Sequence, residues 1–188
     1  MRDVAPETVP CPGCGSQDHF PWYDLSPWQL VTCAGCRVVY LRVRPRQDQL
    51  EHIYEEDYFS GHLGLSDSVD PVVIRTQALH HRFWLEHLLS FRREGRLLEV
   101  GCAYGFFLHL ARHYGFEVAG VELSAKAVAF AREVLRLPVE PVAPGRYPWP
   151  DGSFDALLLS HVIEHLPRPR EFLAEARRLL APGGLLFI

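Results

Sequence analysis

Residues 97–108, which read LLEVGCAYGFFL, decide the fold that we predict for this chain. Three of the first four residues are apolar, which is typical of a strand buried in a parallel sheet. Gly101 and Gly105 then bracket a short turn, and FFLHLARHY predicts a helix over 106–114. A strand, a glycine-containing turn and a helix in this order let backbone N–H groups approach a ligand closely. The dinucleotide fingerprint GxGxxG is absent, so the turn alone is a weak signal.

Strands and helices alternate through the rest of the chain beyond this turn. The segments are a second strand EVAGVEL (117–123), a helix SAKAVAFAREVLR (124–136) with Ser124 as its N-cap, a short third strand LPVEPV (137–142), a fourth strand FDALLLS (154–160), a helix PREFLAEARRLL (169–180) and the start of a fifth strand, LLFI (185–188). This order predicts an α/β fold, a Rossmann-like parallel sheet with right-handed crossovers.

The segment before this sheet has a helical pattern. RQDQLEHIYEEDYF (46–59) predicts one helix, and PVVIRTQALHHRFWLEHLLSFRRE (71–94) predicts a longer one, because Ile74, Ala78 and Leu85 recur near one face. We therefore expect three parts: 1–45, 46–95 as helices that cap the site, and 96–188 as the domain of the parallel sheet.

Four of the five cysteines form two close pairs near the N-terminus. Cys11-Pro-Gly-Cys14 is followed, after eighteen residues, by Cys33-Ala-Gly-Cys36. Each CxxC turn places two thiolates on one side of a tight knuckle, and two knuckles supply four sulfurs for tetrahedral Zn²⁺. The spacing predicts a structural zinc ribbon over 1–45, with no open metal position for catalysis. Redox chemistry or disulfides are the alternatives.

A carboxylate ends the predicted second strand. Glu122 lies 17 residues past Gly105, and a carboxylate at this place can accept hydrogen bonds from both ribose hydroxyls of an adenosine group. WPDGSFDALLLSHVIEHL then supplies Asp155 and a fourth strand, which we expect to line the reaction cleft. The glycine turn and Glu122 together predict a nucleoside-type ligand at the carboxyl edge of the sheet.

With these motifs, residues 97–188 resemble the class I S-adenosylmethionine-dependent methyltransferases. With the cysteine pairs and PRQDQLEHIYEEDYF included, the chain looks like the bacterial zinc-ribbon branch, whose members are often associated with sugar or polysaccharide biosynthesis. The resemblance implies S-adenosylmethionine as cofactor and a small, possibly sugar-derived, acceptor. It also implies cofactor contacts at Glu99, Gly101, Cys102, Ala103, Gly105, Glu122, Trp149 beside the adenine, and Ser160.

The sequence departs from the family at one point. Val142-Ala143-Pro144 stands where the family usually has an acidic residue for the adenine amino group. Adenine recognition would then use backbone groups, or the affinity would be lower.

Ser160 and His161 leave the fourth strand at its carboxyl end, where open α/β sheets place their ligands. His161 is the first candidate for a general base and His165 the second; the alternative is that both only shape the cleft.

HVIEH also fits the H-x-x-E-H string of some zinc proteases, but the preceding strand and Pro167 disagree with the sustained helix that such a site requires. Some RNA methyltransferases bind Mg²⁺ through E-x-x-E-H here, and this chain has His161 in place of the first glutamate.

Composition limits the partners. The net charge of −4 and a neutral cysteine segment make nucleic acid an unlikely partner, and an RNA methyltransferase is therefore the weaker alternative. No run of about 18 apolar residues predicts a membrane span, and the N-terminus lacks the apolar core of a signal peptide, so we expect a cytoplasmic protein.

The predicted fifth strand would leave an apolar strand unpaired at the edge of the sheet. We therefore expect a homodimer, or a partner chain that completes the sheet. The alternative is a truncated, non-catalytic remnant that binds cofactor or a partner.

Overall fold

The computed structural model describes residues 5–46, 70–142 and 147–188. It divides the chain into two compact units, which are described separately. The predicted helix over 46–59 lies almost entirely outside the described residues, and so do Ala143 and Pro144 of the predicted adenine neighbourhood.

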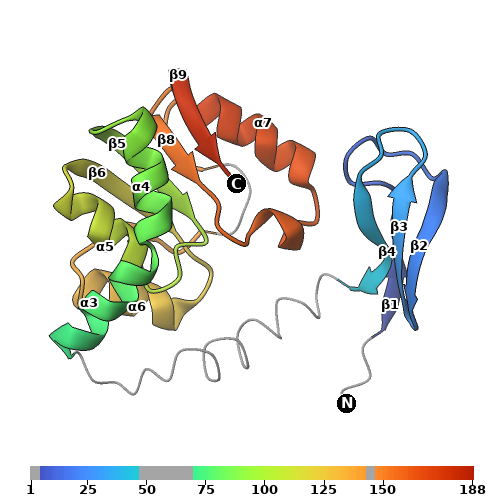
Figure 1. The fold of residues 1–188 in the computed structure, drawn as a ribbon, viewed down its shortest axis with the longest axis horizontal. Helices are drawn as coiled ribbons and strands as arrows, with labels where there is room; N and C mark the ends of the chain where they lie inside the picture. Colours follow the sequence, from blue (N-terminus) through green and yellow to red (C-terminus); the bar gives the residue numbers. More distant parts are fainter. Residues whose placement is uncertain (1–4, 47–69, 143–146) are drawn as a thin grey trace. The chain divides into compact units, whose positions relative to one another are not determined.

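The N-terminal strands form a small antiparallel sheet of order β1-β4-β3-β2 (Figure 1). Its strands are β1 (Pro6–Thr8), β2 (His19–Leu25), β3 (Trp28–Cys33) and β4 (Val39–Pro45). Along β3 and β4 the burial alternates, because Val31, Cys33 and Tyr40 pack with Cys11 on one face of the sheet. Four residues are a very small core, so apolar burial alone gives this sheet little stability.

The second unit contains a parallel sheet of order β7-β6-β5-β8-β9, which confirms the predicted α/β class. Its strands are β5 (Gly95–Val100), β6 (Phe116–Val121), β7 (Val139–Glu140), β8 (Phe154–Leu158) and β9 (Leu180–Phe187). Leu97 of β5 pairs with Val118 on one side and Ala156 on the other, so β5 lies at the centre. The chain reverses its direction of strand addition beside β5, and ligands of such sheets bind at that point.

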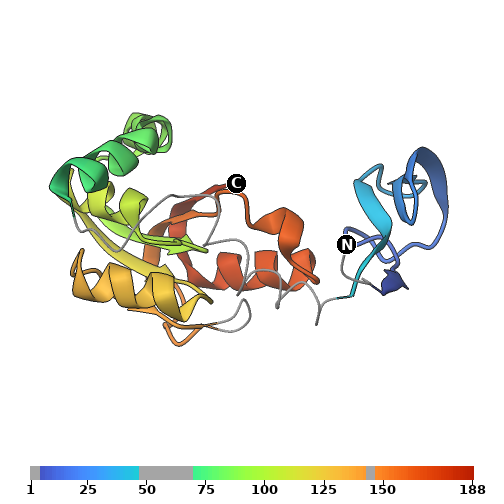
Figure 2. The same ribbon diagram turned by 90° about the horizontal axis from the view of Figure 1, so that it is seen from below.

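Helices cover both faces of this sheet (Figure 2). The helices are α3 (Pro71–His80), α4 (Arg82–Phe91), α5 (Phe106–His113), α6 (Ala125–Glu133), α7 (Pro169–Leu179) and the short 3-10 helix η2 (Ile163–His165). Phe172 and Leu179 of α7 belong to the same buried cluster as Leu98 and Val100 of β5, while α3 and α4 contact α5. None of the described helices is long and apolar enough to cross a bilayer.

The helix predicted over 71–94 is divided at His81. The N–H of His81 donates to the carbonyls of Ala78 and Leu79, so the chain closes a tighter turn there and α4 starts in a new direction. The His81 ring then packs edge-on against Phe107 of α5, with ring centroids 6.3 Å apart. This tertiary contact between helices has no signature in the local sequence.

The fifth strand is longer than LLFI. Leu180 already pairs with Phe154, and the regular pairing resumes at Leu185 opposite Ala156. The residues between, which include Gly183 and Gly184, form an irregularity in β9. Ser124 caps α6 as predicted, accepting from the Ala127 N–H at 3.3 Å.

Candidate functional site

The glycine turn between β5 and α5 requires residues that tolerate left-handed backbone. Gly101, Ala103 and Gly105 all have positive φ, at 69°, 47° and 79°. A Cβ on Gly101 would lie 2.6 Å from Cγ2 of Val162, and one on Gly105 would lie 2.6 Å from Cδ1 of Leu137. These two positions therefore need glycine both for conformation and for space.

Glu122, which follows β6, closes this turn from the neighbouring strand. One carboxylate oxygen accepts from the Ala103 N–H at 2.8 Å, and the other accepts from the N–H groups of Leu123 and Ser124 at 2.8 and 2.9 Å. The side chain is nearly buried, with a relative exposure of 9%. The structure thus brings Glu122 to Ala103 at the carboxyl edge of the sheet.

Glu99 lies just beneath this turn on β5 and is 4% exposed. Among the described residues its Oε2 atom has no hydrogen-bond partner. Burial, and then the nearby carboxylate of Glu122, raise the pKa of Glu99 well above its usual value. A buried, unpaired carboxyl group beside a second carboxylate is an unfavourable arrangement that a cationic ligand would relieve.

Cys102 is buried in the same turn and takes no nucleophilic role in this arrangement. Its pKa is raised well above the usual value by burial, and then by Glu99 and Glu122. A thiol that resists ionisation is a poor nucleophile, so Cys102 acts as a small packed residue whose backbone lines the turn.

The end of β8 runs beside the glycine turn. Ser160 is partly exposed, and His161 adopts a left-handed φ of 55°, which is uncommon for a residue other than glycine. Val162 then packs against Gly101. The unusual backbone at His161 lets Val162 turn into this contact, and the imidazole projects outward with 83% of the side chain exposed.

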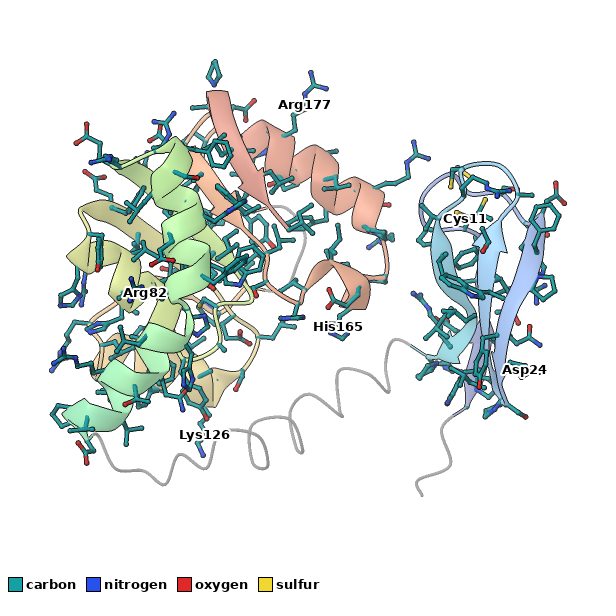
Figure 3. The ribbon with its side chains drawn as sticks, viewed as in Figure 1. Cys11, Asp24, Arg82, Lys126, His165 and Arg177 are labelled. Carbon is teal, nitrogen blue, oxygen red and sulfur yellow. The ribbon has the colours of Figure 1, made fainter. Side chains whose placement is uncertain are left out.

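Glu164 lies between the two candidate bases. Its Oε1 atom is 3.6 Å from Nδ1 of His161 and 4.0 Å from Nε2 of His165, which ends η2 (Figure 3). These separations are longer than hydrogen bonds, but a carboxylate at this place can orient either imidazole. Sequence reasoning did not assign a role to Glu164.

Trp149, which we predict to lie beside the adenine, is in the loop before β8. Its ring packs edge-on against Phe154, the first residue of β8, with centroids 5.2 Å apart. Its carbonyl accepts from Arg178 in the last turn of α7 at 2.8 Å. Trp149 therefore lies at the amino end of β8, because the short loop before that strand leaves the ring beside its first residue.

Gly120 and Val162 are site residues that the sequence did not single out. A Cβ on Gly120 would lie 2.7 Å from Cδ1 of Leu108 and 2.8 Å from the sulfur of Cys102. A glycine inside a strand often marks such a close approach, so EVAGVEL held a usable signal for Gly120. Val162 had none, because its partner Gly101 is distant in sequence.

The four paired cysteines gather at one end of the N-terminal sheet, where Figure 3 shows their sulfur atoms near Cys11. The sulfurs of Cys11 and Cys36 are 3.5 Å apart, as are those of Cys14 and Cys33, and all four ligand atoms lie within 4.8 Å of one another. A tetrahedral Zn²⁺ with Zn–S bonds of about 2.3 Å requires S–S separations of about 3.8 Å. The donor set and its spacing fit such an ion.

Two of these thiols, Cys33 and Cys36, have pKa values that are shifted in opposite directions. The Cys36 N–H donates to the sulfur of Cys33, and this bond is the main cause that lowers the pKa of Cys33 to about 6. The Val38 N–H lowers the pKa of Cys36, but the Cys11 thiol and burial outweigh it and raise that pKa to about 12. Four sulfurs this close cannot all ionise without a cation among them.

Residues 98–188 match a family model described as "Methyltransferase domain". This matched stretch begins inside β5 and contains the glycine turn, Glu122, Ser160 and His161. The matched stretch covers slightly less than half of the chain.

Named relatives include methyltransferases of several kinds. A ubiquinone biosynthesis O-methyltransferase of Caulobacter sp. strain K31 is 34% identical over 121 residues, covering 54% of this chain and 46% of the relative. A 2-methyl-6-phytyl-1,4-hydroquinone methyltransferase of Synechocystis sp. is 26% identical over 196 residues, covering 89% and 60%. An ajmaline N-methyltransferase of Rauvolfia serpentina is 30% identical, covering 52% and 36%. The chain thus spans about half the length of these relatives.

Solved structures share the fold. An S-adenosylmethionine-dependent methyltransferase from Mesorhizobium loti superposes with a TM-score of 0.51 at 24% identity, covering 61% of this chain and 54% of that one. The [4+2]-cyclase SpnF superposes with a TM-score of 0.50 at 27% identity, covering 61% and 43%.

Residues 98–188 therefore match a methyltransferase domain model, and the parallel-sheet fold is shared with solved structures.

The free energy of unfolding should depend on pH through the buried carboxyl group of Glu99. Its folded pKa is raised above the unfolded value of about 4.3, so the native state binds more protons and stability falls as pH rises through that range. We expect Glu99→Gln to become progressively more stable than the wild type as the pH increases from about 5 to about 8, as measured by urea unfolding.

Glu117→Gln, on the exposed end of the same sheet, is the matched control and should give a curve parallel to the wild type. Parallel curves for Glu99→Gln as well would contradict a raised pKa at Glu99.

Proposed function

We propose that this chain transfers a methyl group from S-adenosylmethionine to a small-molecule acceptor, and that its four-cysteine cluster holds a structural zinc ion. The observation that carries the first part is the hydrogen bond between the Glu122 carboxylate and the Ala103 N–H, directly above the unpaired Glu99.

The charge of this site suits a cationic ligand. Glu99 and Glu122 are both buried, and among the described residues neither is paired with a basic side chain. S-adenosylmethionine carries a sulfonium and an ammonium group, so it brings positive charge to a site that has an excess of carboxylate. Glu99 would lie nearest the methionine end, because it is beneath the glycine turn.

Glu122 would contact the ribose. Its carboxylate holds three backbone N–H groups in the free protein, and two carboxylate oxygens have about four acceptor positions in all. Acceptor capacity is therefore left for a ribose hydroxyl. The backbone of Gly101 to Gly105 would lie along the cofactor, with the glycines admitting it at close range.

The acceptor would approach the carboxyl end of β8. The names of the ubiquinone and hydroquinone relatives favour an aromatic hydroxyl-bearing acceptor, whereas the zinc-ribbon resemblance favours a sugar. Both are small molecules with a hydroxyl, whose oxygen becomes a better nucleophile when a base removes its proton.

His161 is the proposed base, with His165 as the second candidate. His161 stands on strained backbone at the end of β8, and Glu164 lies 3.6 Å from Nδ1, so that Nε2 is free to receive the acceptor proton. S-adenosylmethionine supplies the methyl group when it is bound; the chain's own contribution is to orient the acceptor and take its proton.

The zinc would stabilise the N-terminal sheet. Four protein sulfurs would complete its tetrahedral coordination, which leaves no position for a substrate. Because the apolar core of this sheet is so small, metal binding would contribute much of its folding free energy.

Cofactor binding tests the proposed function. We expect calorimetry to show that S-adenosylmethionine binds the full chain and that Glu122→Gln weakens binding at least about tenfold, since a hydrogen bond to a charged group is worth about 1.5–3 kcal/mol. Glu117→Gln lies at the other end of the same strand and should bind like the wild type. Unchanged affinity in folded Glu122→Gln would refute the proposed site.

The role of His161 is tested by turnover. His161→Asn keeps a residue that tolerates left-handed backbone, and we expect it to lower the rate of S-adenosylhomocysteine formation about 10²- to 10⁴-fold without changing cofactor affinity. The assay uses whichever of a catechol and a nucleotide-linked sugar supports turnover. His113→Asn, at the exposed last residue of α5, controls for loss of a histidine elsewhere. A fall of less than about threefold in His161→Asn would exclude His161 as the base.

Zinc content tests the cysteine cluster. We expect elemental analysis to give about one zinc per chain and Cys14→Ser to lose it, together with the native circular dichroism of the antiparallel sheet. Cys102→Ser is the matched control, because Cys102 belongs to the other unit and should keep the zinc. A full chain that folds without any bound metal would contradict a structural zinc.

A further inference from the structure

Glu99 lies on the face of the parallel sheet that α5 covers. Leu98 and Val100, its neighbours on β5, belong to the buried cluster that includes α7, so the side chain of Glu99 points to the opposite face. Gly120, its register partner on β6, closely approaches Leu108 of α5 on that face. The Glu99 side chain, which is 4% exposed, is therefore enclosed between the central strands and α5.

The two titratable groups beside Glu99 bring no positive charge. Cys102 in the glycine turn remains a thiol, because burial and the two nearby carboxyl groups raise its pKa well above the usual value. Glu122 carries the negative charge of the pair, since both of its oxygens accept hydrogen bonds from backbone N–H groups, which stabilise a carboxylate. By contrast, Oε2 of Glu99 has no hydrogen-bond partner in the described part of the chain.

The strand and the helix packed around Glu99 add no cation. Leu158 of β8 lies opposite Glu99 in the sheet, and α5 buries Phe107 and Leu108. Arg112 of α5 donates instead to two backbone carbonyls in the loop after α6. The surroundings of Glu99 are therefore apolar apart from the turn itself.

The histidines of this region supply no cation either. Burial lowers the pKa of His81, which packs on Phe107, and that of His109 on α5. His87 packs among the aromatic side chains of α4, and the ring of His161 projects outward from the end of β8. Both histidines with a lowered pKa are neutral at pH 7.

The pair of carboxyl groups therefore keeps one proton. In a site that excludes water, a carboxylate with no cation and an unsatisfied oxygen, beside a second carboxylate, is less stable than the neutral acid. The N–H groups around Glu122 assign the charge to it and the proton to Glu99, whose pKa is raised by burial and by Glu122. Residues 47–69, which lie outside the described ranges, contain neither lysine nor arginine that could offset this charge.

Given the cofactor site proposed above, we propose that Glu99 is neutral in the free protein and releases its proton to solvent when a cationic adenosyl ligand binds. The positive group of the ligand then replaces the proton as the partner of the carboxyl group. Glu99 thereby selects for the charge of the ligand: an adenosyl compound with an ammonium or sulfonium group gains an ion pair, and a neutral nucleoside does not. Because a proton leaves on binding, affinity for the cationic ligand rises with pH.

Calorimetry of the full chain tests this proton release. Titrations with S-adenosylmethionine at pH about 5.5–7, in two buffers that differ in ionisation enthalpy, give the number of protons released; the α-ammonium group, with a pKa of about 7.7–8.0, stays charged in this range. We expect about 0.5–1 proton per bound cofactor at the pH of greatest release. The affinity should rise there by up to about tenfold per pH unit.

Two further ligands identify the group that displaces the proton. Any binding of 5′-methylthioadenosine, which lacks both positive charges, should release no proton and should not depend on pH. S-adenosylhomocysteine keeps the ammonium and lacks the sulfonium. Release with this ligand as well as with S-adenosylmethionine assigns the effect to the ammonium, and release with S-adenosylmethionine alone assigns it to the sulfonium.

Glu99→Gln keeps the size of the side chain but cannot ionise, so it should bind S-adenosylmethionine without proton release and with an affinity independent of pH. Glu117→Gln, an exposed carboxyl group on the same sheet, is the matched control and should release protons like the wild type.

Fewer than about 0.2 protons released by the wild type at every pH, while S-adenosylmethionine binds, overturns the proton release and leaves the proposed cofactor site standing. Release that persists in Glu99→Gln, or that equally accompanies 5′-methylthioadenosine, overturns it too. The wild-type count decides even where Glu99→Gln does not fold. Absence of any S-adenosylmethionine binding overturns the proposed function itself, and the proton release with it.

Discussion

The hydrogen bond from the Ala103 N–H to the Glu122 carboxylate ties the tip of β6 to the glycine turn after β5. It fixes a left-handed turn residue and an anionic side chain at the same point, between strands that are neighbours in the sheet. Glu99 is buried just below, with an oxygen that no described residue satisfies. The protein thus maintains an unfavourable concentration of carboxylate at the carboxyl edge of its sheet, and such a feature is retained where a ligand compensates it.

The same turn constrains the elements around it. Gly101 leaves space for Val162, Gly105 leaves space for Leu137, and Gly120 admits Leu108 and Cys102 beneath the turn. A Cβ at any of these points would lie within 2.8 Å of a neighbouring side chain, so glycine lets the end of β8, the loop after α6 and the first turns of α5 approach closely. The left-handed His161 belongs to this arrangement, since it redirects the chain from β8 into the contact of Val162 with Gly101. Fold and proposed chemistry therefore depend on the same few backbone positions.

The N-terminal sheet follows a different principle. Its core has four residues, two of which are cysteines, and the four paired sulfurs lie close enough for one tetrahedral ion. The parallel sheet, by contrast, encloses its apolar residues between helices. Metal coordination is a means by which such a small sheet gains stability.

Local pattern alone determined much of this protein: the order of strands and helices in the second unit, the Ser124 cap, the glycine turn, the carboxylate after the second strand and the clustering of Cys11, Cys14, Cys33 and Cys36. These features are encoded by residues close together in sequence or by a fixed spacing, so periodicity and motif suffice to find them. Only the tertiary structure decided the break at His81, which depends on Phe107, the place of Trp149, which depends on Phe154 and Arg178, and the approach of Val162 to Gly101. Each of these is a contact between segments far apart in the chain, and no local propensity carries the information of which distant side chain will be met there.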